Sequence, residues 1–182
     1  DKWSISDDKL TWTFHINDKV KFSNGDKLTA EIAKESLERT FKLSNRAQSV
    51  FQYAEIKAEG QNLIIKTKNP TPSLPGMLAD PLFIIIDTKV KDRDIKKEGP
   101  ICTGPYAVKT YSKAKAVMVA NPNYWDGAVP FKNAEIPTID DPNTRAMALQ
   151  KGEIDFAINI AAGDLQLFKD KAKYNISEIA SL

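Results

Sequence analysis

The sequence contains very few of the residues that most often carry catalysis or bind metals. Its 182 residues include one cysteine, Cys102, and one histidine, His15. A single cysteine excludes an internal disulfide, and one cysteine with one histidine is too small a set to build a metal site by spacing. We therefore expect no metal ligands, no catalytic residues and no bound cofactor. A lone cysteine is compatible with a reducing and with an oxidising compartment.

Long hydrophobic runs and an excess of one charge are also absent. Twenty-six basic residues face 24 acidic ones, and the lysines are scattered, so we expect no nucleic-acid partner. No apolar run approaches the length of a membrane span. The chain begins "DKWSISDD" without a Met or a signal peptide, so we expect a processed chain or a piece of a longer one. A 42% hydrophobic content predicts a globular chain of one domain or two small lobes.

The first third predicts a strand followed by a helix. In "KLTWTFHI" apolar residues alternate with polar ones, as in a half-buried strand, with Trp12 and Phe14 on the core side and His15 on the polar side. Thr29 is a good helix cap, and apolar spacing after it predicts a helix that ends near Leu43. We expect this helix and strand to share one core with Ile16, Leu37 and the later segment "LFIIID".

The middle of the chain predicts mostly strands and turns. Residues 53–69 indicate a hairpin, residues 82–87 ("LFIIID") a buried strand, and residues 103–127 two strands around Ser112 and Lys113 followed by a loop packed by Tyr124 and Trp125. The Pro-rich residues 69–81 predict irregular structure, and residues 89–100 a charged surface loop. These patterns favour an α/β class with a mixed sheet and flanking helices.

The last third predicts a strand, a helix and a strand within "TIDDPNTRAMALQKGEIDFAIN", residues 138–159. Asp141 suits the N-cap, Pro142 the first helical position and Gly152 the C-terminal stop. A further helix from about Asp164 and a final strand follow. Arg145 is unexpected in the first turn, because the positive end of a helix dipole favours anions. Either Asp141 neutralises it or an anionic ligand does.

Three blocks of the sequence together resemble one protein family. They are "LTWTFHINDKVKFSNGDKLTAEIAKESLERTF", "TGPYAVKTY" with "NPNYWDG" downstream, and "DDPNTRAMALQKGEID". The chain resembles solute-binding protein family 5, the nickel- and peptide-binding proteins of ABC importers. The resemblance implies a first-lobe fragment of a two-lobe periplasmic-binding-protein (type II) fold with the second lobe absent. Residues of about 10–130 would form a β-rich subdomain, and 131–182 a part of the main lobe.

The resemblance also implies two ligand-binding residues. Nickel-type members hold a polycarboxylate chelate with two first-lobe arginines, and these fall on Arg46 and Arg145 here. Where the nickel-type pattern has a tryptophan, this chain has Ser49, with Phe51 nearby. Two guanidinium groups on one wall of a cleft would bind carboxylates without touching the metal. The alternative is that Arg46 is a solvated loop cation and Arg145 pairs with Asp141.

The function implied is extracytoplasmic capture of a nickel or other metal chelate for an ABC permease, or alternatively of an oligopeptide. The protein would act as a monomer, be periplasmic or lipid-anchored, and catalyse nothing. An enzyme using Cys102 and His15 lacks an identifiable third residue, so Cys102, which replaces the family's usual Gly, is interpreted as a buried or half-buried thiol. A sensor or chaperone-like module is a further alternative.

Overall fold

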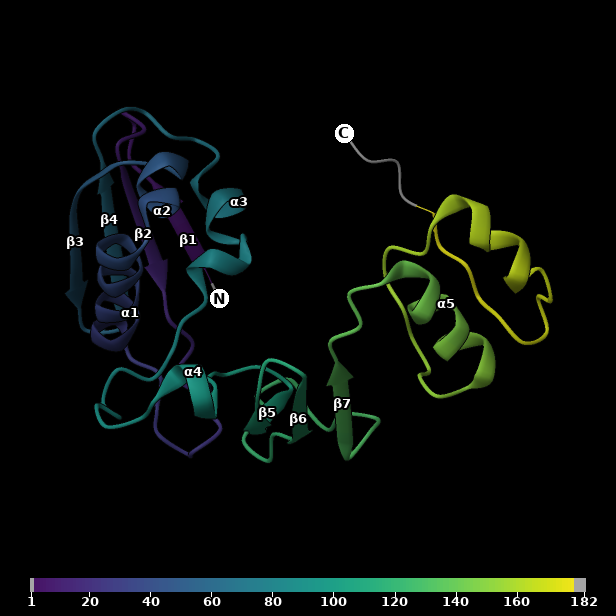
Figure 1. Cartoon of the computed structure of the whole chain (residues 1–182). Helices are drawn as coiled ribbons and strands as arrows, with labels where there is room; N and C mark the ends of the chain where they lie inside the picture. Colours follow the sequence, from purple (N-terminus) through teal and green to yellow (C-terminus); the bar gives the residue numbers. More distant parts are fainter. Residues whose placement is uncertain (1, 179–182) are drawn as a thin grey trace. The chain divides into compact units, whose positions relative to one another are not determined.

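The computed structural model describes residues 2–178 and divides the chain into two compact units, Asp1–Ile136 and Pro137–Leu182. Figure 1 shows the elements of each unit. Helices accompany two sheets, so the predicted α/β class is confirmed, with two sheets in place of one mixed sheet.

The first sheet has the strand order β1-β2-β4-β3, with every neighbouring pair antiparallel. Its strands are β1 (Lys2–Ile5), β2 (Thr11–His15), β3 (Tyr53–Glu59) and β4 (Asn62–Thr67). The predicted strand over "TWTFH" and the predicted hairpin are therefore confirmed. Strand β1 was not predicted: its four residues alternate polar and apolar, but this run is too short to indicate a strand by itself, and three of the four are exposed.

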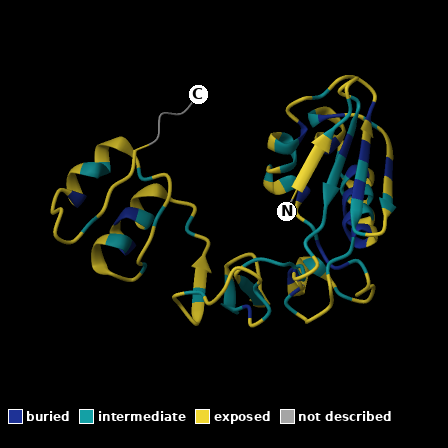
Figure 2. Cartoon of the chain, turned by 180° about the vertical axis from the view of Figure 1, so that it is seen from behind, coloured by how far each residue is buried: buried dark blue, intermediate teal, exposed yellow. Residues whose placement is uncertain are grey.

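Helix α1 (Ala30–Leu43) packs against this sheet, as Figure 2 shows by the buried residues between them. Its N-cap is Thr29, whose side chain accepts from Ile32 N, and it ends before Ser44 as predicted. Trp12, Leu37 and Phe83 lie in the core, and Phe14 and Ile16 pack against it. The predicted core is thus confirmed. A second short helix, α2 (Asn45–Val50), begins at once, so Arg46 lies on a helix and not in a loop.

The segment after β4 differs from both predictions made for it. Helix α3 (Leu74–Leu78) lies within the Pro-rich stretch, and the predicted strand "LFIIID" is wrong: it begins with the 3₁₀ turn η1 (Pro81–Phe83) and continues as extended chain. Ser36 of α1 explains why. Its hydroxyl donates to Ile84 O (3.3 Å) and accepts from Ile86 N (3.0 Å). A buried helix side chain thus satisfies main-chain groups that a neighbouring strand would otherwise bind.

The rest of the first unit is a small helix and a three-stranded sheet of order β5-β6-β7. Helix α4 (Ile95–Glu98) lies in the predicted surface loop, and the sheet comprises β5 (Tyr106–Tyr111), β6 (Lys115–Ala120) and β7 (Asn133–Pro137). The predicted turn at Ser112 is confirmed by the β5–β6 pairing. Gly99 ends α4 with φ +71°, and a Cβ there would lie 2.7 Å from Val108 Cγ1, so glycine is required.

The second unit contains helix α5 (Pro142–Lys151) and the 3₁₀ segment η2 (Ala162–Phe168). Asp141 caps α5 and Gly152 ends it at φ +77°, both as predicted. The predicted strand over residues 154–159 is wrong. Phe156 is 79% and Ile158 64% exposed, and no strand of the described chain pairs with them. Of the predicted final strand, residues 174–178 are irregular and 179–182 lie outside the described residues.

The Ser36 contact yields a test of stability. Replacing Ser36 by Ala leaves the buried Ile86 N–H and the Ile84 carbonyl without their partner. We expect the free energy of unfolding to fall by about 1–3 kcal/mol, measured by chemical denaturation. Ser4→Ala on the exposed strand β1 is the matched control and should change it by less than about 0.5 kcal/mol. Equal effects of the two substitutions would show that Ser36 does not hold this segment.

Candidate ligand-binding site

Arg46 lies on the exposed side of helix α2. The helix begins there because Ser44 caps it, its hydroxyl accepting from Ala47 N at 3.3 Å. The Arg46 side chain is 69% exposed, and Nη2 donates to Asp80 Oδ2 at 2.8 Å. The other oxygen, Oδ1, accepts from Leu82 N, so the η1 turn fixes the carboxylate. Arg46 is therefore a solvent-facing cation with one edge of its guanidinium engaged.

Arg145 is held quite differently, within the second unit. Its Nη1 donates to Ile139 O at 2.6 Å and its Nη2 to Asn159 O at 2.8 Å. The guanidinium thus joins the chain entering α5 to the segment that follows it. Asn159 has φ +56°, a left-handed conformation that asparagine tolerates, and in this conformation its carbonyl accepts from Arg145.

The ion pair that the sequence offered for Arg145 is not the contact observed. No carboxylate of the described residues lies within 4.0 Å of its guanidinium, so the ion pair with Asp141 is not formed. Asp141 instead accepts from the hydroxyl and the amide of Thr144, which lower its pKa. Main-chain carbonyls neutralise part of the Arg145 charge. Its Nε is buried and has no partner in the described part of the chain.

The two arginines belong to different units, Arg46 to the first and Arg145 to the second. Arg46 donates to a carboxylate, whereas Arg145 donates to two main-chain carbonyls. The sequence did not indicate Asp80, Ile139 and Asn159 as their partners. The signal for Asp80 was an acidic residue before Pro81, a good cap for a short turn. A carbonyl gives no signal in the sequence, because every residue has one.

Cys102 and His15 do not form a catalytic arrangement. Burial raises the pKa of the Cys102 thiol to about 11, so it is protonated at neutral pH. His15 Nδ1 is 3.1 Å from Asn62 Oδ1, across the β2–β4 pair. Cys102 instead contributes its carbonyl, which accepts from Ser23 N at 2.9 Å. Its φ is not positive, so this position does not need glycine's freedom.

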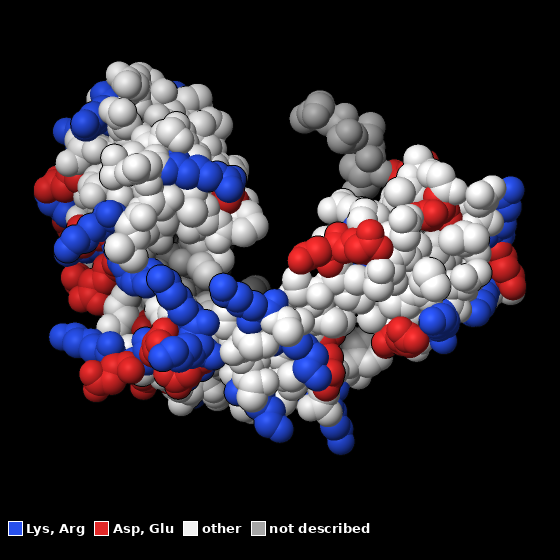
Figure 3. All heavy atoms as spheres, in the orientation of Figure 1, with Lys and Arg blue, Asp and Glu red and all other residues white. Residues whose placement is uncertain are grey.

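The described residues offer neither a group of metal-binding side chains nor a helix that could span a membrane. Among residues 2–178 no three His, Cys, Asp or Glu side chains are grouped so that they could hold a metal ion. No helix in that range has the length and apolar character needed to cross a membrane. Figure 3 shows basic and acidic side chains interspersed on the visible face.

Comparison with known proteins gives the chain its family. The profile of the bacterial extracellular solute-binding proteins, family 5 (middle), matches residues 1–182. The nickel-binding protein NikA of Staphylococcus aureus is 31% identical over 169 residues, which are 92% of this chain and 34% of that protein. A dipeptide-binding protein of Lactococcus lactis is 30% identical over 186 residues, covering 85% of this chain and 34% of that protein.

Solved structures agree with the sequence comparison. The nickel ABC transporter structure from Bacillus halodurans matches with a TM-score of 0.85 at 30% identity, covering 93% of this chain and 35% of that one. The chain spans about a third of the length of the relatives it matches. It belongs to family 5 of the bacterial extracellular solute-binding proteins.

Proposed function

We propose that this chain is part of a protein that captures a nickel chelate, or a related metal chelate, for an ABC importer. The observation that carries the proposal is the match to nickel-binding relatives over nearly the whole chain, by sequence and by fold.

The chemistry of recognition would come from Arg46 and Arg145. A guanidinium offers a planar set of N–H donors that binds carboxylates, and each such contact contributes about 1.5–3 kcal/mol when well formed. Arg46 uses only Nη2 on Asp80, so its other N–H groups face solvent. Arg145 is fixed by its two carbonyls, and the second N–H of each Nη atom is the donor it would offer a ligand.

An oligopeptide is the alternative ligand. A dipeptide-binding protein is among the relatives, and this chain has Ser49 where the nickel-type pattern has tryptophan. A peptide also carries a carboxylate, so the same arginines could hold its C-terminus. A nickel chelate and a peptide would therefore be distinguished by the residues that contact the rest of the ligand, and not by the two arginines.

Capture would follow the mechanism of two-lobe binding proteins. The ligand binds one lobe and favours the closed state because it contacts both lobes there, and the closed form docks on the permease. The protein would be a monomer outside the cytoplasm, in the periplasm or anchored by lipid. It would catalyse nothing; in line with this, the Cys102 thiol is protonated at neutral pH and has no base bonded to it among the described residues.

Titration calorimetry of the full-length protein tests the ligand. Nickel with histidine, nickel with a tricarboxylate, nickel alone and dipeptides would be compared. We expect heat of binding with a nickel chelate and none with nickel alone. Binding of dipeptides without binding of any chelate would replace the nickel proposal by the peptide alternative.

Arg46→Ala tests direct recognition. We expect the affinity of the full-length protein for its anionic ligand to fall by roughly 10–100-fold, through loss of a charge-assisted contact. Stability should fall by less than about 1 kcal/mol, because the pair with Asp80 is exposed. Lys57→Ala removes another exposed, ion-paired cation of the first unit and is the control. Unchanged affinity in the Arg46 variant would remove Arg46 from the site.

Arg145→Ala should change both binding and stability. Losing the bonds to Ile139 O and Asn159 O should lower the free energy of unfolding by about 2 kcal/mol, and the ligand affinity by roughly tenfold or more. Lys151→Ala, at the exposed end of the same helix, is the control. A loss of stability without loss of affinity would restrict Arg145 to holding the unit together.

The pH dependence of Cys102 alkylation tests the absence of a reactive thiol. With a pKa of about 11 the thiolate forms only at high pH, so the rate with iodoacetamide should keep rising above pH 9. At pH 8 we expect it to be at least about tenfold slower than in the denatured chain, whose thiol has an ordinary pKa. A plateau at neutral pH would instead indicate an activated cysteine and reopen the enzyme alternative.

A further inference from the structure

Asn24 precedes Gly25 in the turn between β2 and α1, and this is the only Asn-Gly pair in the sequence. Both residues are exposed, and Gly25 has φ +95°. Glycine has no side chain to hinder attack of its main-chain nitrogen on the side-chain amide before it. The pair is therefore chemically able to lose ammonia, and the consequence depends on the contacts of the Asn24 side chain.

The Asn24 side chain donates to two carboxylates. Its Nδ2 is 2.8 Å from Asp87 Oδ2 and 3.0 Å from Asp26 Oδ2. Its Oδ1 accepts from Asp26 N at 3.1 Å. An amide NH₂ group has two hydrogens, so one nitrogen can serve both carboxylates. Asn24 is thus a neutral donor between two negative charges.

Asp87 needs this donor because it is buried. It is only 6% exposed, and no Lys, Arg or His nitrogen of the described residues lies within 4.0 Å of its carboxylate. Its other oxygen, Oδ1, accepts from Lys89 N at 3.0 Å. A buried carboxylate without hydrogen bonds is costly, so the contact with Asn24 holds the turn against this residue.

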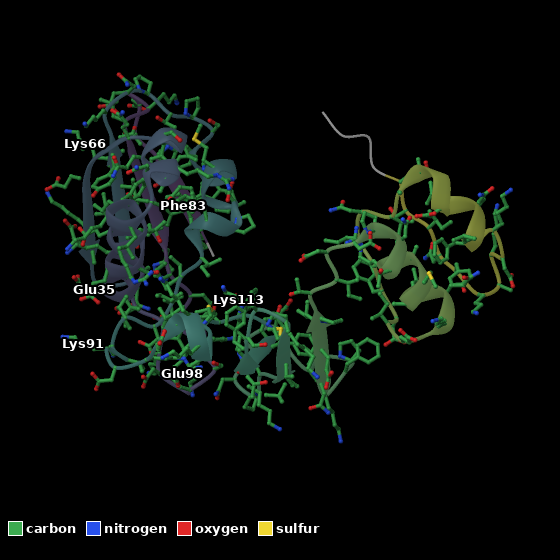
Figure 4. All side chains as sticks on the ribbon, viewed as in Figure 1. Glu35, Lys66, Phe83, Lys91, Glu98 and Lys113 are labelled. Carbon is green, nitrogen blue, oxygen red and sulfur yellow. The ribbon has the colours of Figure 1, made fainter. Side chains whose placement is uncertain are left out.

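The segment that carries Asp87 is itself fixed on its other sides. The main-chain nitrogen of Asp87 donates to Ile101 O at 2.9 Å. The next residue, Thr88, donates from its hydroxyl to the carboxylate of Glu35 on α1, which is labelled in Figure 4. A negative charge introduced at position 24 would therefore be relieved by movement of the exposed turn, residues 22–26, and not of Asp87.

We propose that Asn24 is a site of non-enzymatic deamidation and that its conversion releases the turn 22–26 from Asp87. Gly25 N loses its proton and attacks Asn24 Cγ, the bond from Cγ to Nδ2 breaks, and ammonia leaves. Water then opens the cyclic imide at one of its two carbonyls, which gives aspartate or isoaspartate. Either product has a carboxylate in place of the amide donor. Three carboxylates would then meet, and Asp87 would lose its side-chain donor.

The folded turn slows this reaction without preventing it. Gly25 N donates to Phe22 O at 2.9 Å, so the turn must open before this nitrogen can attack. Exposed turns open locally at a small fraction of the free energy of global unfolding. The alternative is a purely structural turn in which Asn24 remains an amide.

Peptide mapping by mass spectrometry tests the chemistry. The full-length protein would be incubated at mildly alkaline pH, native and denatured, and digested at intervals. Asn69 is the control in the same digest: it is exposed, but Pro70 follows it, and the proline nitrogen has no hydrogen to lose. We expect aspartate and isoaspartate at position 24 of the native protein and not at position 69. A native position 24 that stays an amide while the denatured one is converted, or equal conversion at position 69, would overturn the proposal.

Hydrogen exchange of the turn tests the consequence. In the full-length protein, Asn24→Asp should accelerate exchange of the amides of residues 22–26 by about tenfold or more, through loss of a charge-assisted bond and added repulsion. Asn69→Asp adds the same charge at another exposed position and should change this exchange by about twofold or less. Deamidated protein, separated by ion exchange, should behave as Asn24→Asp does. Unchanged exchange in both would contradict release of the turn.

A double variant identifies the partner. Combining Asn24→Asp with Asp87→Asn exchanges donor and acceptor, so one hydrogen bond between the two side chains can form again and the repulsion between them is removed. We expect this variant to restore slow exchange of residues 22–26, with circular dichroism confirming that it is folded. Fast exchange in a folded double variant would show that Asp87 does not hold the turn. If the double variant unfolds, the deamidated wild-type protein decides the question.

Discussion

The structure depends on one constraint: main-chain polar groups in irregular segments must find partners, and side chains supply them. Ser36 satisfies Ile84 and Ile86, and Thr67 donates to Asn69 O at 2.7 Å. Trp12 adds a bond from its indole to Thr71 O at 3.0 Å. An unsatisfied buried group costs about 1–3 kcal/mol, so these few side chains decide where the loops can lie. Packing of the hydrophobic core alone would not determine where these loops lie.

The sequence predicted the elements whose signals are local. Alternation gave β2 and the β3–β4 hairpin, and the caps Thr29, Asp141 and Gly152 placed both long helices. It failed for "LFIIID", because an apolar run reports burial and not which groups bind the backbone. There the partner was Ser36, 48 to 50 residues earlier in the chain.

The sequence indicated the two residues of the candidate site but not the groups that they contact. The family resemblance selected Arg46 and Arg145, while their observed contacts are a carboxylate and two carbonyls. The cap on Asp141 could be derived locally, but its preference for Thr144 over Arg145 could not. Thr144 and Arg145 are both close enough in sequence to donate to the Asp141 carboxylate. Which of them does so depends on the three-dimensional geometry, which the spacing of residues does not give.

Arg145 matters most because of the unit in which it lies. The described part of this unit buries only Ala146, Ala148 and Phe168, while Phe156 and Ile158 are exposed. With so little apolar burial, the two bonds from Arg145 carry an unusual share of the local stability. They also hold its guanidinium in one position before any ligand arrives. A donor that is already fixed loses less conformational entropy on binding. The two bonds that stabilise the unit would therefore also increase the affinity of Arg145 for an anion.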